Sequence, residues 1–438
     1  MRFCMLKYLG IFLALILTSF FFFPVEFVWF PGFNTKTAMA GVGLLVLSIQ
    51  LARKSVPIID AGLLSVAGWA LAVSFMSFLS ITYNGTNDLS FVTYFISMCV
   101  WLCAAYLATK IIQMVHGYLS VKLVSNYLIA VCTIQCIIAF LIGQSSVVEQ
   151  LVNSVVITGE AEMITGRLYG IGAGFDVAGL RFMAVLTITA YMMTHLSEYE
   201  SRKYLIWYII AFSIISLIGN MISRSTVFGI ILGFGYLVWA SFTGKIKIRS
   251  NLLRLWKCLS IFIGVLMVAS IFLYQINQGF RNSMHYGFEG FFSLYEKGKW
   301  EVSSNKGLVW MWQNVKPEHI RTWIIGDGYC DDPFHDPYYT GPKFNSSYYM
   351  GTDVGYMRFI FYFGVLGTLV FIGYFCQTAY VCGKHFPHYK NMFLLILLCN
   401  FIGWLKVATD IFVVFAIFLA IILSPYWEEN EEIHKIEA

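Results

Sequence analysis

Residues 205–242 read LIWYIIAFSIISLIGNMISRSTVFGIILGFGYLVWASF, which is two apolar runs parted by one short polar turn. The runs, Leu205 to Ile222 and Val227 to Phe242, approach the length of about 20 helical residues that crosses a hydrocarbon core of about 30 Å. The polar residues between them, Ser223-Arg224-Ser225-Thr226, leave room only for a tight connection. This stretch predicts two antiparallel transmembrane helices and sets the pattern for the rest of the chain.

The same pattern repeats along the chain, whose 438 residues are 58% hydrophobic and 12% charged. Soluble proteins carry about a quarter of charged residues, so lipid is the expected solvent. We therefore expect an all-α polytopic membrane protein with about 12 transmembrane helices. The predicted spans are Tyr8 to Trp29, Thr37 to Ala52, Ala61 to Ile81, Leu89 to Ala108, Val124 to Ile142, Phe182 to Thr194, Leu205 to Ile222, Val227 to Phe242, Leu255 to Tyr274, Val354 to Val381, Phe393 to Val407 and Ile411 to Leu423.

Basic residues in the short loops predict the orientation, because Lys and Arg accumulate on the cytoplasmic side. They fall on one side if both termini are cytoplasmic: Arg53, Lys54, Lys110, Arg202, Lys203, Lys245, Lys247, Arg249, Lys384 and Lys390. Helices one to nine are then expected in residues 1–274, with an outer segment near 143–180. Residues 354–438 hold helices ten to twelve and an acidic cytoplasmic tail. The outer loop at 275–353, between helices 9 and 10, is too long for a simple connector and should carry helices of its own.

Charge and cysteine usage exclude two further classes of protein. The Lys and Arg residues are scattered rather than gathered into a basic stripe, so nucleic acid is not an expected partner. Among the ten cysteines only Cys330 lies in the large outer loop. No disulfide framework is therefore expected.

Three arginines stand at the predicted outer boundary, against the positive-inside bias. Arg181 opens the sixth predicted helix, Arg224 occupies the tight turn, and Arg358 lies one turn into the tenth helix. An arginine within a span costs about 3 kcal/mol unless it snorkels or finds an anionic partner. Because guanidinium forks onto phosphate oxygens, the three together predict a pyrophosphate clamp. Snorkelling to lipid headgroups, or pairing with Asp or Glu, is the alternative.

A fourth arginine, Arg167, lies in the glycine-rich stretch TGRLYGIGAGFD at residues 165–176. Glycine permits turns and close backbone approach, which suits a segment that folds over a ligand. The stretch neither follows a strand nor opens a βαβ unit, so it is no dinucleotide fingerprint. A flexible surface loop is the alternative reading.

The large outer loop mixes aromatic with polar residues, which suits sugar stacking and equally suits anchoring at the membrane interface. Its stretch Cys330 to Pro337 gathers acidic residues around His335. His335 is a candidate general base, because neighbouring carboxylates raise its proton affinity. The acids would also suit a hard cation, but their spacing matches no metal-site signature, and we expect no metal or other cofactor.

Asp353 stands where the loop meets the tenth predicted helix, in GTDVGYMR at residues 351–358. Asp at such a position caps a helix by accepting a backbone N–H and facing the positive end of the dipole. It is also a candidate proton acceptor, and the two roles are compatible. Asp353 and Arg358 lie about a turn and a half apart. This spacing brings a proton acceptor and a hydrogen-bond donor for phosphate to the same end of the helix.

Four stretches resemble motifs of the O-antigen polymerase and O-antigen ligase superfamily, membrane glycosyltransferases of the GT-C type. Ser223 to Thr226 resembles the Ser-Arg step between two helices. Gly166 to Leu180, with the adjoining Arg181, resembles the first periplasmic arginine segment. Trp310 to Tyr329 is similar to the tryptophan-containing helix followed by Gly-x-Gly, and Asp353 to Gly367 looks like the helix after the loop. Ligases place a histidine where this chain has Asp353, so the resemblance favours a polymerase.

The resemblance implies an inverting enzyme of the bacterial inner membrane whose site faces the periplasm. Its substrate would be undecaprenyl pyrophosphate carrying an oligosaccharide, and its product O-antigen, capsular or related polysaccharide. Arg181 and Arg224, with Arg167 or Arg358, would hold the pyrophosphate, while Asp353, or else His335, would accept the proton of the incoming sugar hydroxyl. A chain-length regulator and a flippase would be partners. The alternatives are an O-antigen ligase and a lipid-linked-glycan flippase or other transporter.

Overall fold

The computed structural model describes residues 2–53, 60–158, 167–243, 249–335, 340 and 347–424. Within these ranges the chain is helical, with isolated β-bridges and no β-strand. The long helices are α1 (Arg2–Phe22), α2 (Thr35–Ala52), α3 (Ala61–Asn84), α4 (Tyr94–His116), α5 (Val121–Gln144), α8 (Phe175–Thr194), α9 (Glu198–Ile222), α10 (Thr226–Phe242), α11 (Arg249–Ile276), α16 (Gly355–His385), α17 (Lys390–Gly403) and α18 (Phe412–Ile422). Short helices between them are α6 (Ser146–Val155), α12 (Gln278–Gly287), α13 (Glu289–Lys297), α14 (Ser303–Asn314), α15 (Ile320–Ile324), and the 3-10 turns η1 (Pro333–His335), η2 (Tyr349–Gly351) and η3 (Pro387–Tyr389).

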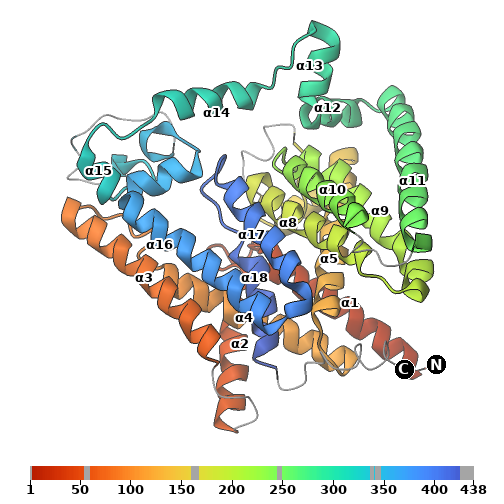
Figure 1. The fold of residues 1–438 in the computed structure, drawn as a ribbon, viewed down its shortest axis with the longest axis horizontal. Coiled ribbons are helices and arrows are strands. Elements are labelled where there is room, and N and C mark those ends of the chain that lie inside the picture. Colours follow the sequence, from red (N-terminus) through yellow and green to blue (C-terminus); the bar gives the residue numbers. More distant parts are fainter. Residues whose placement is uncertain are drawn as a thin grey trace.

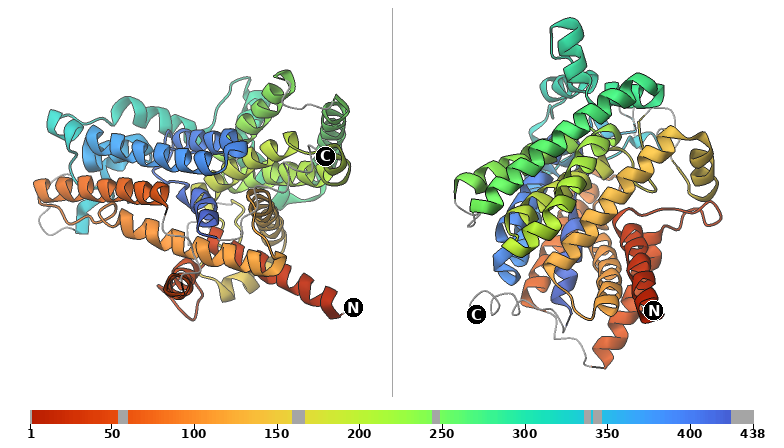
Figure 2. Two further views of the ribbon diagram at one scale, coloured as in Figure 1. Left: turned by 60° about the horizontal axis from the view of Figure 1, so that its bottom comes forward. Right: turned by 90° about the vertical axis from the view of Figure 1, so that its right-hand side faces the viewer.

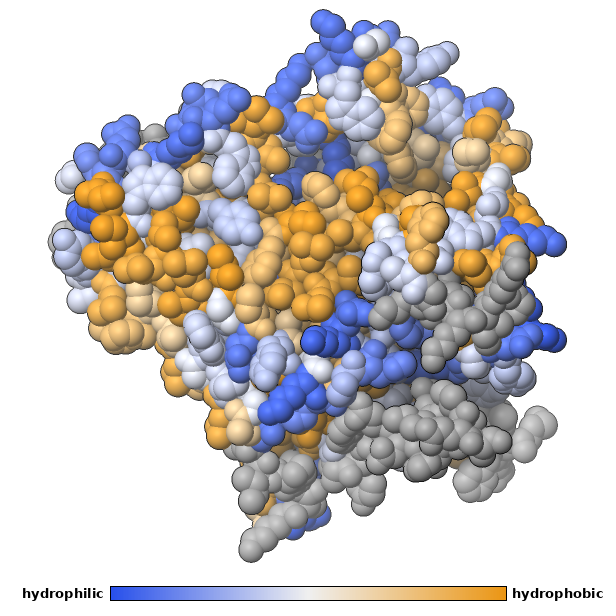
Figure 3. All heavy atoms as spheres, in the orientation of Figure 1, coloured by the Kyte–Doolittle hydropathy of each residue, from blue (hydrophilic) through white to orange (hydrophobic). Residues whose placement is uncertain are grey.

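Each of the twelve predicted spans overlaps one of the long helices. Within the described ranges, 8 helices are long and apolar enough to cross a membrane, namely α2, α3, α4, α5, α8, α9, α11 and α16. Helices α10, α18 and the apolar part of α1 are shorter. An apolar belt lies between hydrophilic rims on the molecular surface (Figure 3). The predicted class, an all-α polytopic membrane protein, is therefore confirmed.

Contacts between distant segments define the two ends of the helix bundle. At the first end, called the loop end, Thr86 after α3 donates to the carbonyl of Gly328 at 2.9 Å. At the second, called the basic end, Lys122 of α5 pairs with Glu200 of α9. The described basic loop residues Arg53, Lys110, Arg202, Lys203, Lys384 and Lys390 belong to helix segments at the basic end. Lys54, Lys245, Lys247 and the acidic tail lie outside the described residues, as does the side chain of Arg249.

The segment between α11 and α16 forms an arch over the loop end. Figure 1 shows α14 running across the bundle from α12 and α13, beside α11, to α15, beside α3 and α16. Figure 2 shows α13 projecting beyond the bundle, and α11 lying along its outside. Only 6% of the apolar window of α11 is buried. Most of α11 is therefore left for lipid contact.

Helix α16 is interrupted, and the arch fills the interruption. Gly364 adopts φ 68°, which breaks the helical hydrogen bonding of the residues before it. The backbone N–H of Asp327 donates to the carbonyl of Phe361 at 2.6 Å, and that of Gly328 donates to the carbonyl of Tyr362 at 3.1 Å. A broken membrane helix persists only where other groups satisfy its free carbonyls. The Gly326-Asp327-Gly328 segment does so here.

Two sequence-based boundaries differ from the structure. Helix α8 begins at Phe175, so the prediction that Arg181 opens the sixth helix is wrong. Gly174 caps α8, and the negative charge of Asp176 in the first turn is favourable at the positive end of the helix dipole. The helix therefore starts earlier in the chain than predicted. In α16 the cap is Val354, with no side-chain hydrogen bond, so Asp353 does not cap that helix.

Candidate functional site

A partly buried carboxylate joins three separate segments at the loop end. Asp176, in the first turn of α8, accepts hydrogen bonds from the hydroxyls of Ser223 at 2.7 Å and Ser225 at 2.5 Å. It also forms an ion pair with Lys406 at 2.7 Å, between α17 and α18. Lys406 donates in addition to Ser225 Oγ at 3.0 Å. These four residues are called the Asp176 cluster, and they fix the α9–α10 turn against α8 and α17.

Close packing of glycine allows the cluster to form. A Cβ added to Gly179 would lie 2.5 Å from Ser223 Oγ. Real Cβ atoms do not approach an oxygen so closely, so any larger residue would push the α9–α10 turn away from α8. The position of the turn, and with it the position of Arg224, depends on this contact.

Two of the predicted arginines lie against the same aromatic ring. The guanidinium carbon of Arg224 lies 4.3 Å from the Tyr286 ring centroid, and that of Arg167 lies 5.0 Å from it. Burial raises the pKa of Tyr286, while Arg167 and Arg224 act to lower that pKa. Arg167 also stacks on Phe175, at 5.3 Å. Its Nε is buried with no hydrogen-bond partner, and it makes no ion pair within the described part of the chain.

Arg224 is also the main tie between the arch and the bundle. Its Nε donates to the carbonyl of Tyr286 at 2.9 Å, and an NH1 hydrogen goes to Ser304 Oγ at 3.0 Å. Its NH2 forms an ion pair with Glu289 at 2.8 Å. A guanidinium has five N–H groups, so these contacts leave two for a ligand. Arg224 thus has a structural role that sequence reasoning did not foresee.

Asp353 lies in the linker before α16, near the same cluster. Its backbone N–H faces Met311 Sδ at 3.4 Å, and its carboxylate accepts no hydrogen bond from the described residues. Burial raises the pKa of Asp353, and the charge of Asp176 adds to that effect, whereas Arg358 and Lys406 act to lower the pKa. Asp353 is exposed, so a substrate can reach it, and an unpaired carboxylate within reach of a hydroxyl is suited to accept its proton.

Arg358 holds the end of the arch on α16. It is 8% exposed, and its NH2 donates to the carbonyl of Cys330 at 3.1 Å and pairs with Asp331 at 2.9 Å. Its guanidinium also covers the Tyr348 ring at 3.8 Å. Burial raises the pKa of Asp331, while Arg358 acts to lower that pKa. Arg358 is engaged by the protein, but its charge reaches Asp353.

The structure does not bring Arg181 to this group. Arg181 is 7% exposed, donates to the carbonyl of Phe22 and packs against the rings of Phe22, Phe23 and Trp101. Among the described residues, Arg181 shares no hydrogen-bond, ion-pair or ring partner with Arg167 or Arg224, so the predicted grouping of Arg181 with Arg224 is not seen. Because α8 begins before Arg181, the residue lies almost two turns inside the helix rather than at its mouth.

The second predicted base, His335, ends η1, and its side chain lies outside the described part of the chain. Asp336 and Pro337 also lie outside it. In the ranges that the structure does describe, no group of three or more His, Cys, Asp and Glu side chains is placed to hold a metal ion.

Sequence reasoning missed Lys406, Tyr286 and Glu289, and it passed over Asp176 within the glycine-rich stretch. One signal was available. Lys406, at the end of the eleventh predicted span, and Asp410, in the gap after it, are two opposite charges where a membrane protein rarely carries charge without a partner. The partner of Lys406 lies 230 residues away, so only the fold identifies it.

The fold and the site together define a multi-pass helical membrane protein with a charged site at one end of its bundle. Beyond that class, no family model, curated protein or solved structure matches this chain.

Proposed function

We propose that this protein is a membrane glycosyltransferase that joins oligosaccharide units carried on a polyprenyl diphosphate into a surface polysaccharide. In this proposal the chain crosses the bacterial inner membrane twelve times, with both termini in the cytoplasm and the arch in the periplasm. The observation that carries the proposal is Asp353, an unpaired carboxylate with a raised pKa among the charges of Lys406, Asp176 and Arg358. The sequence resemblance supplies the class of substrate.

The reaction follows from the charges around Asp353. The carboxylate takes the proton of the incoming sugar hydroxyl as that oxygen attacks the anomeric carbon of the donor. The new glycosidic C–O bond forms while the bond to the diphosphate breaks, and the polyprenyl diphosphate leaves with the electron pair. Attack from the face opposite the leaving group inverts the anomeric centre.

Cationic side chains near Asp353 would stabilise the leaving diphosphate. Arg167 has no ion pair within the described residues, and Arg224 keeps two N–H groups beyond those that hold the arch. Lys406 would exchange part of its contact with Asp176 for a phosphate oxygen. Charge-assisted hydrogen bonds aimed at a developing anion are among the largest contributions to catalysis.

The test is polymer formation by the purified protein in detergent, supplied with lipid-linked repeat units. We expect the wild type to lengthen the glycan and Asp353→Asn to lower the rate by about 100-fold or more, as loss of a general base does. Glu296→Gln, which removes an exposed carboxylate on α13 of the same arch, is the matched control and should retain the wild-type rate. Full activity in Asp353→Asn would exclude Asp353 as the base.

A transporter of lipid-linked glycans is the second candidate function. It is favoured by three charges placed within the bundle, Lys36 of α2, Arg181 of α8 and Asp410 before α18, which act on one another electrostatically. A transporter would move the glycan across a sealed vesicle membrane and leave its length unchanged. Glycan lengthening in detergent, where no second compartment exists, would rule out transport as the sole activity.

The ligase alternative differs only in the acceptor. A deletion strain that keeps single capped units but lacks long chains indicates a polymerase, whereas accumulation of unattached full-length polymer indicates a ligase.

A further inference from the structure

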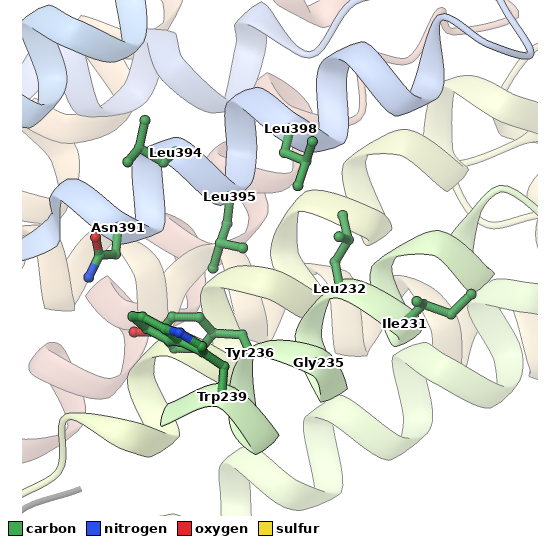
Figure 4. Close-up of a pocket in the computed structure, with 9 residues that line it drawn as sticks. All are labelled: Ile231, Leu232, Gly235, Tyr236, Trp239, Asn391, Leu394, Leu395 and Leu398. Atoms are coloured by element: carbon green, nitrogen blue, oxygen red, sulfur yellow. The ribbon is translucent and has the colours of Figure 1, made fainter. Parts of the chain in front are cut away.

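An apolar groove of about 410 Å³ runs between α10 and α17. Figure 4 shows Leu394, Leu395 and Leu398 of α17 facing Ile231, Leu232 and Tyr236 of α10 across it. Trp239 and Asn391 lie towards one end of the groove, where α10 finishes and α17 begins. That is the basic end, at which amphipathic aromatic side chains favour the membrane interface.

The other end of the groove points to the Asp176 cluster. Helix α10 begins directly after Ser225, and α17 ends at Gly403, three residues before Lys406. Ile231 lies six residues beyond Ser225 on α10, so the apolar lining starts about 9 Å along the helix from the cluster. The hydrogen bond of 3.0 Å between Lys406 and Ser225 connects the segment after α17 to the residue before α10 at this end. The Lys406–Asp176 ion pair and the adjoining Arg224 therefore lie beyond this end of the apolar groove.

The groove is not filled by the side chains of the protein itself. A Cβ added to Gly235 would meet no atom within 4 Å. Ile231 is 59% exposed and Leu394 is 49% exposed, although both lie in the apolar belt. Lipid tails are the natural contents of such a space, and a chain held between two helices loses less freedom than one held on a flat surface.

We infer that the groove holds the hydrocarbon chain of the polyprenyl diphosphate whose head group lies at the Asp176 cluster. The inference rests on the proposed function and adds the place of the lipid tail. Charge complementarity selects this occupant, because Arg224, the residue before Ser225, keeps two N–H groups for the anionic end of such a lipid, and Arg167 has no ion pair among the described residues. The single chain of the lipid would follow the groove from that end towards Trp239. The donor accordingly reaches the site from the bilayer between α10 and α17.

The experiment measures binding of two probes to the full-length protein in detergent. The long probe is undecaprenyl diphosphate, and the short probe is dimethylallyl diphosphate, whose five-carbon tail is shorter than the distance of about 9 Å between the cluster and the apolar lining. Gly235→Trp introduces a large apolar side chain into the groove at a position where the added Cβ meets no protein atom within 4 Å. Gly264→Trp on α11 is the matched control. A Cβ at Gly264 also meets no atom within 4 Å, and Gly264 does not line the groove between α10 and α17.

We expect Gly235→Trp to weaken binding of the long probe by about tenfold, which corresponds to about two buried methylene groups, and to leave the short probe unaffected. Gly264→Trp should bind both probes as the wild type does. Unchanged binding of the long probe by Gly235→Trp would overturn the inference, as would equal displacement of that probe by a diacyl phospholipid without a diphosphate.

The failure of the inference is distinguishable from the failure of the proposed function. If the short probe binds, and Arg224→Ala weakens it, while Gly235→Trp has no effect on the long probe, the diphosphate site stands and the groove is excluded. If the wild type binds neither probe, both are excluded. If Gly235→Trp changes only the oligomeric state, the groove is an interface between copies of the chain, and the inference is wrong.

Discussion

At the scale of single residues, the site depends on which charges have partners inside the protein and which do not. Arg358 and Arg224 are bound to carboxylates of the arch, and Lys406 is bound to Asp176. Asp353 has no such partner among the described residues. A titratable group that has a perturbed pKa and no ion-pair partner is a candidate for a functional role.

The raised pKa of Asp353 predicts an acid limit on activity. A general base works only in its deprotonated form, so kcat/KM falls as the pH drops through the pKa of Asp353. Because that pKa is raised, the fall should begin at a higher pH than for an ordinary exposed aspartate. The pH–rate profile of the wild type checks this. Asp353→Glu should still lose activity at low pH. If the residual activity of Asp353→Asn fell over the same pH range as that of the wild type, another group would be responsible for the acid limit.

Arg224 has two roles that paired substitutions separate. Arg224→Ala removes both the tie to Glu289 and the contact proposed with diphosphate, and we expect kcat/KM to fall about 10- to 100-fold, which corresponds to about 1.5–3 kcal/mol. Glu289→Gln removes only the ion pair, which is partly exposed and contributes at most about 1 kcal/mol.

In Glu289→Gln the amide oxygen can accept from the backbone N–H of Ser303, while the amide NH2 donates to Ser303 Oγ in place of the hydrogen bond that Oε2 accepts in the wild type. We therefore expect this variant to keep activity within about fivefold of the wild type. Equal losses in Arg224→Ala and Glu289→Gln would show that Arg224 acts only by holding the arch. Steady-state kinetics on lipid-linked repeat units distinguish the two results.

At the scale of elements, the interruption of α16 depends on glycine. Gly326 has φ 88°, and a Cβ there would lie 2.4 Å from the carbonyl oxygen of Tyr362. We expect Gly326→Ala to destabilise the protein by more than about 1 kcal/mol, because the strained φ and the clash add. Gly298→Ala is the control, since φ there is 66° but no atom lies within 4 Å.

Thermal unfolding in detergent, followed by tryptophan fluorescence, compares the two glycine variants. A lower midpoint in Gly326→Ala than in Gly298→Ala would isolate the cost of the clash. Equal midpoints would mean that Gly326 can move away from Tyr362 without loss, and that the segment does not seal α16.

Sequence alone identified the elements well, because the thickness of a bilayer fixes the length of an apolar run. Residues 205–242 became α9, its turn and α10 almost as read. The start of α8 was missed, since Asp176 and Arg181 look like loop residues until their partners are known. Those partners, Lys406 for Asp176 and the ring of Trp101 for Arg181, come from distant helices that no periodicity connects.

At the scale of the whole molecule, the basic residues at one end and the arch at the other predict a single orientation. A Cys-depleted protein carrying Tyr295→Cys on α13, at a site 90% exposed, should react with an impermeant maleimide added to whole cells whose outer membrane is permeable to it. Tyr199→Cys on α9, at a site 70% exposed, should react only after the inner membrane is opened.

The reverse pattern of labelling would place the arch in the cytoplasm and remove the proposed glycosyltransferase site from the periplasm. Labelling of both residues in intact cells would indicate a mixed orientation. In either case the assignment as a helical membrane protein remains.

The interruption of α16 also constrains how the protein is made. The carbonyls of Phe361 and Tyr362 receive their hydrogen bonds from residues 327 and 328, which precede them in the chain and belong to the arch. Helix α16 therefore reaches its final form only when the arch has packed against it. In the orientation proposed above, translocation of the arch would have to precede the completion of this helix.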